Sequence, residues 1–188
     1  MERPPRRRVA ALRWSIVAAA ALASASASAI ESEAGPLSIQ PAAFPAALTF
    51  FIDRRLPEDF RPSLEEARRR LSDSRCADVL TDFEDLRGRR LDHNVEALGH
   101  TAASYLSLVL FYDGRPTAAC GSRSTLAWTT PGSRAVHVCW DQFLAQERKS
   151  AGLTANTLIH EALHTLGLGE TPPDPRVITA RVAARCGN

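Results

Sequence analysis

The chain has 188 residues, of which 45% are hydrophobic and 23% are charged, and its formal net charge at pH 7 is +2. These values are ordinary for a globular protein and exclude a mainly disordered chain, and the length predicts one domain rather than two. A domain of this size buries enough apolar surface to fold without a structural metal.

The N-terminal residues 1–29 have the features of a secretory signal peptide in the usual order. Five arginines precede an apolar run over 14–23, and A-x-A cleavage sites follow at 25–27 and 27–29. The run is too short for a stable transmembrane helix, and an uncleaved membrane anchor is the alternative interpretation. We therefore predict a secreted or periplasmic protein without stable membrane insertion after signal cleavage.

Removal of residues 1–29 changes the charge of the chain. That segment holds five of the 23 basic and one of the 21 acidic residues, so 18 basic and 20 acidic residues remain, a net charge of −2. No basic footprint for nucleic acid is left, and we expect no nucleic-acid partner. The arginines at 68–70 follow Glu65 and Glu66 at helical pairing distance, which predicts a solvated helix face.

After residue 29 the chain is first rich in Ala and Pro and then shows helical patterns. Residues 30–62 form an Ala- and Pro-rich lead-in, for which a short pro-segment is an open alternative. The domain proper is expected over 63–188, where Ser63 and Glu66 give the capping box of a first helix. A second helical stretch is expected over 74–86, because its apolar residues recur at helical spacing.

The middle of the chain is expected to form strands. The run 105–112 is rich in aromatic and aliphatic residues and is closed by the turn signal Asp113-Gly114. Another strand is expected within 118–128. Residues 134–139 then alternate between apolar and polar side chains, as a half-buried strand does.

Three helices are expected in the C-terminal part of the chain. The first covers 140–147, the second begins at an N-cap Thr154 and stops at Gly167, and a short final helix covers 176–185. Together with the strands, these helices predict an α+β fold in which a small, mostly antiparallel or mixed sheet packs on helices.

The four cysteines all lie in the exported part of the chain, at Cys76, Cys120, Cys139 and Cys186. An even number in an oxidising compartment predicts two disulfides, for which three connectivities exist. We favour Cys120–Cys139, which would join neighbouring strands, and Cys76–Cys186, which would tie the C-terminus to an early helix. A cysteine-based zinc site is disfavoured because no C-x-x-C pair is present.

The strongest chemical signal is the sequence His160-Glu161-Ala162-Leu163-His164. Histidines four residues apart lie on one helix face, so their ring nitrogens can converge on one metal ion at about 2.0–2.1 Å. Glu161 lies beside that ion without occupying a coordination position, which is where a general base is needed. A bound zinc ion would bring the pKa of its water to about 7, and Glu161 would accept the proton.

The wider pattern H-E-x-x-H-x-x-G-x-x-E over 160–170 resembles the zincin metallopeptidases, and within them the metzincin consensus. The resemblance implies a minimal zincin-like domain in which Gly167 turns the chain sharply after the helix. In that family the strand before the helix is often the sheet edge that pairs with substrate, and 134–139 is the candidate here. The resemblance also implies three zinc ligands and one general base: His160, His164 and Glu170, with Glu161 as the base.

The sequence departs from the metzincin pattern in three respects. The third ligand is usually His or Asp, whereas Glu170 stands here, and Asp174 is the alternative candidate. A Met-turn under the zinc is missing, because Met1 is the only methionine. No Tyr or His follows His164 to steady the oxyanion opposite the zinc. Three residues are open as substitutes for that donor: Arg176, Tyr112 and His137.

The motif therefore predicts a secreted, zinc-dependent peptidase. It would act as a monomer on a peptide or protein substrate and use Glu161 as general base. The missing donor and Met-turn leave open a zinc-binding, non-catalytic interaction domain of the cell envelope. A third interpretation is a disulfide-stabilised domain in which the motif occurs by chance.

Overall fold

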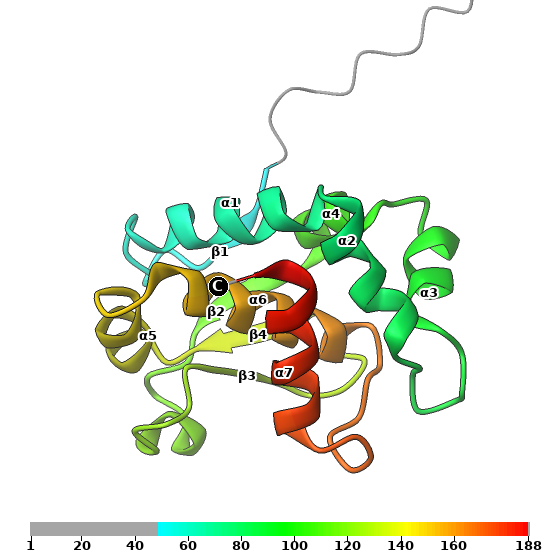
Figure 1. Ribbon diagram of the computed structural model, residues 1–188. Helices are drawn as coiled ribbons and strands as arrows, with labels where there is room; N and C mark the ends of the chain where they lie inside the picture. The colour runs from blue at the N-terminus through cyan, green and yellow to red at the C-terminus, as the bar shows by residue number, and fades with distance from the viewer. Residues whose placement is uncertain (1–48, 188) are drawn as a thin grey trace, which may run out of the picture. The chain divides into compact units, whose positions relative to one another are not determined.

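The computed structural model of the chain describes residues 49–187, so the predicted signal peptide and most of the lead-in lie outside the described residues. The described part forms an α+β domain with a mixed sheet, as expected (Figure 1). None of its helices combines the length and the apolar character needed to cross a membrane.

The elements in chain order are β1 (Phe51–Ile52), α1 (Phe60–Leu71), α2 (Ser74–Ala77), η1 (Asp78–Asp82), α3 (Leu91–Ala97), α4 (Ala102–Tyr105), η2 (Leu106–Leu108), β2 (Leu110–Asp113), η3 (Ala118–Gly121), β3 (Ala127–Thr129), β4 (Ala135–Val138), α5 (Trp140–Glu147), α6 (Ala151–Thr165) and α7 (Pro175–Cys186).

The sheet has the strand order β1-β2-β4-β3. The pairings β1–β2 and β2–β4 are parallel, and β3 runs antiparallel to β4. Strand β4 therefore lies inside the sheet, and β1 and β3 are its edge strands. This corrects the expectation that residues 134–139 form the edge: β4 pairs on both sides, with Val136 opposite Phe111 on β2 and opposite Thr129 on β3.

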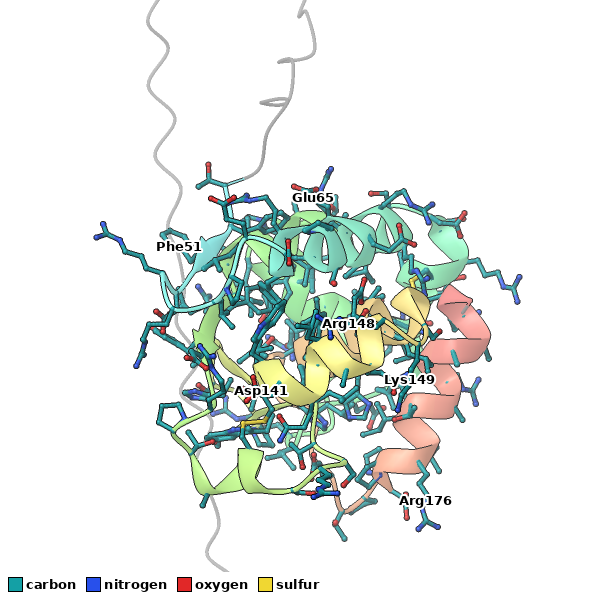
Figure 2. All side chains as sticks on the ribbon, turned by 90° about the vertical axis from the view of Figure 1, so that its left-hand side faces the viewer. Phe51, Glu65, Asp141, Arg148, Lys149 and Arg176 are labelled. Carbon is teal, nitrogen blue, oxygen red and sulfur yellow. A yellow bond between two sulfur atoms is a disulfide. The ribbon has the colours of Figure 1, made fainter. Side chains whose placement is uncertain are left out.

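One face of the sheet packs on the hydrophobic core, and the other face carries stacked aromatic and histidine rings. Phe111, Val136 and Val138 are buried, whereas their neighbours Tyr112 and His137 point to the opposite face, because side chains alternate along a strand. Phe51 on β1 is exposed at the side of the sheet away from α5 and α7 (Figure 2). The helices therefore cover a single face of this sheet.

Helix α6 lies at the centre of the helical layer. It packs against α1, α5 and α7 and against strands β3 and β4 (Figure 1). Its apolar residues recur at three- and four-residue spacing, so one broad stripe faces the core. That stripe consists of Leu158, Ile159, Ala162 and Leu163.

The fold begins before Ser63, where the start of the domain was expected. Phe50 and Leu56 belong to the buried core, and β1 pairs with β2, so part of the lead-in is structured. Helix α1 begins at Phe60, and the predicted capping box is wrong: the Ser63 hydroxyl is buried inside the helix without a hydrogen-bond partner among the described residues. Pro62 is tolerated because it lies in the first helical turn.

Several other boundaries differ from the predicted ones. The run 105–112 is a strand only from Leu110, because a capping box between Thr101 and Ser104 starts the short helix α4. The strand expected within 118–128 begins only at Ala127, after a turn of 3-10 helix. The expected helix over 74–86 ends at Asp82.

The C-terminal helices follow the prediction more closely. Helix α5 has the expected bounds, and α7 extends the expected helix by one residue at each end. Helix α6 begins at Ala151, so Thr154 lies inside it and is not its N-cap. Helix α3 has no counterpart among the predicted elements.

Both favoured disulfides are confirmed. Cys76–Cys186 ties α2 to the last residue of α7, and Cys120–Cys139 ties η3 to the residue that precedes α5. An ion pair between Arg185 and Asp82, 2.7 Å long, adds a second link between α7 and the segment after α2. The position of α7 is therefore fixed near its C-terminal end.

The arginine run at 68–70 pairs with the glutamates one turn earlier, as expected, but its last member is not solvated. Arg70 is only 9% exposed. Its Nη1 donates to Asn156 Oδ1 at 2.8 Å, to the Gly187 carbonyl at 2.9 Å and to the Gly152 carbonyl at 3.1 Å. Arg70 thus joins α1 to α6 and to the end of α7.

Candidate metal centre

The turn that ends α6 brings the chain back toward the histidines. Gly167 has φ +103°, a conformation that side-chain-bearing residues rarely adopt, and a Cβ there would lie 3.0 Å from Asp85 Cβ. The Leu168 N–H donates to the Leu163 carbonyl at 3.2 Å, which closes the turn. Gly167 therefore serves the turning role expected for it, and Glu170 follows on the side of His164.

His160, His164 and Glu170 present their ligand atoms to one point. The two Nε2 atoms lie 3.0 Å apart, and His164 Nε2 lies 3.5 Å from Glu170 Oε1. Two nitrogens of a tetrahedral zinc site are separated by about 3.3 Å when each bond is about 2.0–2.1 Å. All three ligand atoms lie within 4.8 Å of one another, so this group could hold a metal ion.

The alternative ligand Asp174 is engaged elsewhere. Its side chain caps α7 by accepting from the Arg176 backbone N–H at 2.7 Å, and it does not belong to the metal-binding group. Glu170 is therefore the carboxylate that the structure brings to the two histidines.

Each histidine is oriented by a hydrogen bond at its other ring nitrogen. His164 Nδ1 lies 2.8 Å from the Leu168 carbonyl, and because a carbonyl only accepts, this nitrogen carries the hydrogen and leaves the Nε2 lone pair free for a metal. His160 Nδ1 lies 3.1 Å from Thr179 Oγ1 on α7. No sequence signal pointed to Thr179, because it lies on another helix and its distance from His160 depends on tertiary packing.

Burial sets the protonation of the site. Burial lowers the pKa of His160 to about 4, with a further contribution from His164, so this imidazole is neutral near pH 7, the form that binds metals. Burial raises the pKa of Glu161 to about 8, and the charge of Glu170 adds to this effect. A bound cation would lower the pKa of Glu161 again, because an opposite charge favours the carboxylate.

Glu161 is a largely buried residue that lines a cleft. It is 7% exposed, and its carboxyl group makes no hydrogen bond or ion pair within residues 49–187. Its oxygens are not enclosed, because the enclosed side-chain atom that lacks a partner in those residues is the Ser63 hydroxyl. Glu161 lines a cleft of about 450 Å³ together with His160, so its carboxyl group is open to that cleft.

The cleft is bordered by the edge strand and by α7. Its walls include Leu126 and Ala127 at β3, Leu153 on α6 and Ala183 on α7. Strand β3, not the segment 134–139, therefore offers a free backbone edge beside the candidate metal centre.

The three candidate oxyanion donors do not line this cleft. Tyr112 and His137 stack on the outer face of the sheet, where the His137 ring lies 5.7 Å from that of Tyr112 and 4.3 Å from that of Trp128. Arg176, at the start of α7, points away from the body of the domain (Figure 2). Tyr112 and His137 therefore lie away from the cleft, and a role of Arg176 as the donor stays a prediction.

Fold and site together define an α+β domain with a candidate metal centre on a central helix, stabilised by two disulfides. No protein-family model matches the chain, and no curated protein or solved structure is significantly similar to it.

Proposed function

We propose that the protein is a secreted zinc peptidase of the zincin type. The observation that carries this proposal is that a possible set of metal ligands includes a histidine that shares a cleft with a candidate general base. The Nε2 atoms of His160 and His164 lie 3.0 Å apart, and the Glu170 carboxylate belongs to the same group. His160 lines a cleft together with Glu161.

The donor set supports zinc as the metal. Two imidazole nitrogens and one carboxylate oxygen are typical of catalytic zinc sites, in which three protein ligands leave a position open for water or substrate. His160, His164 and Glu170 would hold the ion. When bound, zinc supplies a Lewis acid and lowers the pKa of a coordinated water.

Glu161 would perform the proton transfers. Its carboxylate would accept the proton of the attacking water and pass it to the leaving amine, which is the task of a general base that later acts as an acid. Its low exposure at the wall of the cleft limits the contact of Glu161 with bulk water.

The edge strand supports a peptide as the substrate. An extended peptide can add to a free strand edge through backbone hydrogen bonds, and the edge strand β3 begins at the cleft, which its first residue Ala127 lines. All the proposed ligands and the base come from one chain, which supports a monomeric enzyme. The two disulfides support an oxidising compartment and therefore export, in agreement with the signal-peptide prediction.

The test uses residues 30–188, loaded with zinc, on a mixture of unrelated peptides followed by mass spectrometry. We expect cleavage that a chelator abolishes and that Glu161→Gln lowers by about 10²–10⁴-fold, the usual contribution of a general base. Glu58→Gln, which changes an exposed carboxylate outside the cleft, is the matched control and should cleave normally. Cleavage that persists in Glu161→Gln would contradict the proposal.

A second candidate is a zinc-binding interaction domain of the cell envelope that does not catalyse hydrolysis. It is favoured by one observation: none of the three candidate oxyanion donors lines the cleft. This candidate predicts one zinc ion per chain and no turnover in the same peptide mixture. Hydrolysis that depends on Glu161 would exclude it.

A further inference from the structure

A second cavity of about 400 Å³ lies at the C-terminal end of α6. Its walls come from the segment 85–89, from α3 and from the turn 131–134, and it shares no lining residue with the metal cleft. The proposed peptidase activity makes no use of it. Three arginines line this cavity, and we refer to it as the arginine pocket: Arg87, Arg89 and Arg134.

The arginine pocket carries an excess of positive charge. Asp85 is the one carboxylate among its lining residues, and its oxygens are already engaged. Oδ1 accepts from the backbone N–H groups of Arg87 at 2.8 Å and Arg89 at 3.0 Å, and Oδ2 accepts from Asn94 Nδ2 at 3.0 Å. These bonds, led by that of Asn94, hold the pKa of Asp85 below its usual value.

The guanidinium groups are available to a ligand. None of the three makes an ion pair with an acidic residue in the described part of the chain. Arg89 Nε donates to Asn94 Oδ1, which fixes its guanidinium at the pocket and leaves its other N–H donors free. Arg134 lies close enough to Tyr105 for its charge to oppose the rise that burial causes in the pKa of that phenol.

The rim of the arginine pocket is apolar. Leu86 is 72% exposed and Leu98 is 41% exposed, and both line the pocket with Ala97 beside them. Exposed leucines next to free cationic groups mark a surface that fits a ligand with an anionic head and an aliphatic body.

Two backbone hydrogen bonds and one side-chain hydrogen bond hold the walls of the pocket to the end of α6. The Leu86 N–H donates to the Gly167 carbonyl at 3.0 Å, Asn94 Nδ2 donates to the Leu166 carbonyl at 3.0 Å, and the Gly132 N–H donates to the His164 carbonyl at 2.8 Å. The pocket is therefore formed before any ligand arrives, which lowers the entropic cost of binding.

We propose that the arginine pocket binds an aliphatic carboxylate, of which the C-terminal residue of a peptide ending in leucine is the representative. Planar guanidinium groups bind a carboxylate through paired N–H···O bonds, and this geometry selects a planar, singly charged head. Leu86 and Leu98 cover the side chain of the same residue. The binding requires neither the metal nor Glu161.

The experiment uses residues 30–188 carrying Glu161→Gln, so that no probe is cleaved, with and without a chelator. The probe is a fluorescein-labelled hexapeptide that ends in Leu-Leu with a free carboxylate, followed by fluorescence anisotropy. The same peptide with a C-terminal amide and inorganic phosphate as competitor are the comparison arms. Arg89→Gln and Arg134→Gln test the pocket, Leu86→Ser tests its rim, and Arg61→Gln, an exposed arginine elsewhere, is the control.

We expect the free carboxylate to bind equally with and without the chelator and the amide to bind at least about tenfold more weakly. Each pocket arginine variant should lose about tenfold in affinity, the cost of a hydrogen bond to a charged group. Leu86→Ser should weaken the peptide but not phosphate, and Arg61→Gln should change nothing. The proposal is overturned if the carboxylate and amide peptides bind alike, if both arginine variants bind normally while thermal unfolding shows them folded, or if phosphate binds more tightly than the peptide.

Discussion

Two buried polar clusters lie one turn apart on α6, and they are organised in opposite ways. Around Asn156, the Arg70 guanidinium donates to oxygens of α6 and of the end of α7, and to Glu66 on its own helix. Around His160, two ring nitrogens face each other across 3.0 Å, and the Glu161 carboxyl group makes no hydrogen bond with another described residue. The first cluster is held together by the protein's own hydrogen bonds, whereas the second is the one that we propose to bind a metal ion.

Under the proposed function, this difference separates a structural polar cluster from a metal-binding one. A buried charge that is hydrogen-bonded fixes how elements pack, and its removal leaves its partners exposed to an apolar interior. His160 and His164 contact each other through their Nε2 atoms, and a cation between them would replace that one contact with two metal–nitrogen bonds. The two clusters should therefore respond differently to the same kind of substitution.

Both clusters also share one wall. Helix α7 supplies Thr179 to His160, and Gly187, directly after it, supplies a carbonyl to Arg70. The Cys76–Cys186 disulfide fixes α7 close to the second of these contacts. Four variants follow from this arrangement, and each tests the contrast between the clusters.

The largest effect is expected from removal of the Cys76–Cys186 disulfide by a double Ala substitution. The cysteines are separated by 110 residues, and closing a loop of that length is worth about 5 kcal/mol of unfolding free energy. Metal affinity should fall as well, because α7 carries Thr179. Denaturant unfolding and a zinc competition titration measure the two effects.

The second disulfide provides the control for that experiment. Cys120 and Cys139 are separated by only 19 residues, so their removal should cost about 3 kcal/mol and leave the metal affinity unchanged. Equal losses of metal affinity in the two double variants would show that α7 does not support the metal centre.

Arg70→Met should cost about 3 kcal/mol of unfolding free energy, because it removes a buried charged donor and leaves its acceptors without it. Its zinc affinity should stay within about twofold of the wild type. Arg69→Met is the neighbouring control, since Arg69 is 71% exposed and exposed ion pairs contribute at most about 1 kcal/mol. Urea unfolding measures the stability of both variants. Equal losses of stability in the two would contradict the structural role of Arg70.

Thr179→Val should have the opposite effect to Arg70→Met, with a larger change in zinc affinity than in stability. It removes the hydroxyl that orients His160 but keeps the shape of the side chain, so zinc affinity should fall by about tenfold. The matched control is Thr157→Val in the same cleft, whose hydroxyl donates to the Leu153 carbonyl at 3.0 Å. Competition with a chromophoric chelator measures the zinc affinity of both variants. Identical affinities would contradict a role of Thr179 in zinc binding.

The smallest effect concerns pH. Hydrogen bonds from Arg69 and Arg70 lower the pKa of Glu66 to about 2. Because the folded pKa is depressed, the stabilisation is fully present above the unfolded pKa of about 4.3 and is lost as the pH falls toward 2. Screening at this partly exposed pair limits it to less than about 1 kcal/mol. The melting temperatures of wild type and Glu66→Gln should therefore differ at pH 6 and converge near pH 2, and a constant difference would contradict this.

Local patterns in the sequence predicted the parts of the fold that depend on neighbouring residues. Helix α5, helix α7 and strand β4 follow from spacing, and the histidine face follows from the pitch of α6. The disulfide pairing was one of three possibilities and is confirmed. These features need no knowledge of distant contacts.

The parts that sequence reasoning missed depend on tertiary contacts. Phe51–Ile52 is too short to show a strand pattern and is a strand only because β2 pairs with it. Likewise β3, with three residues, gave no sign that it forms the edge beside the cleft. The burial of Arg70 and the contact of Thr179 with His160 arise where helices distant in sequence meet.

The central claim is that His160, His164 and Glu170 hold a zinc ion. The most direct test is a zinc competition titration of residues 30–188 and of His164→Ala, with thermal unfolding of the metal-free proteins as the folding check. We predict one tightly bound zinc per wild-type chain and an affinity lower by about a hundredfold or more in His164→Ala, since even an outer-shell partner is worth about 10–100-fold. A wild-type chain that binds no zinc, or a folded His164→Ala variant that binds it equally well, would contradict the account.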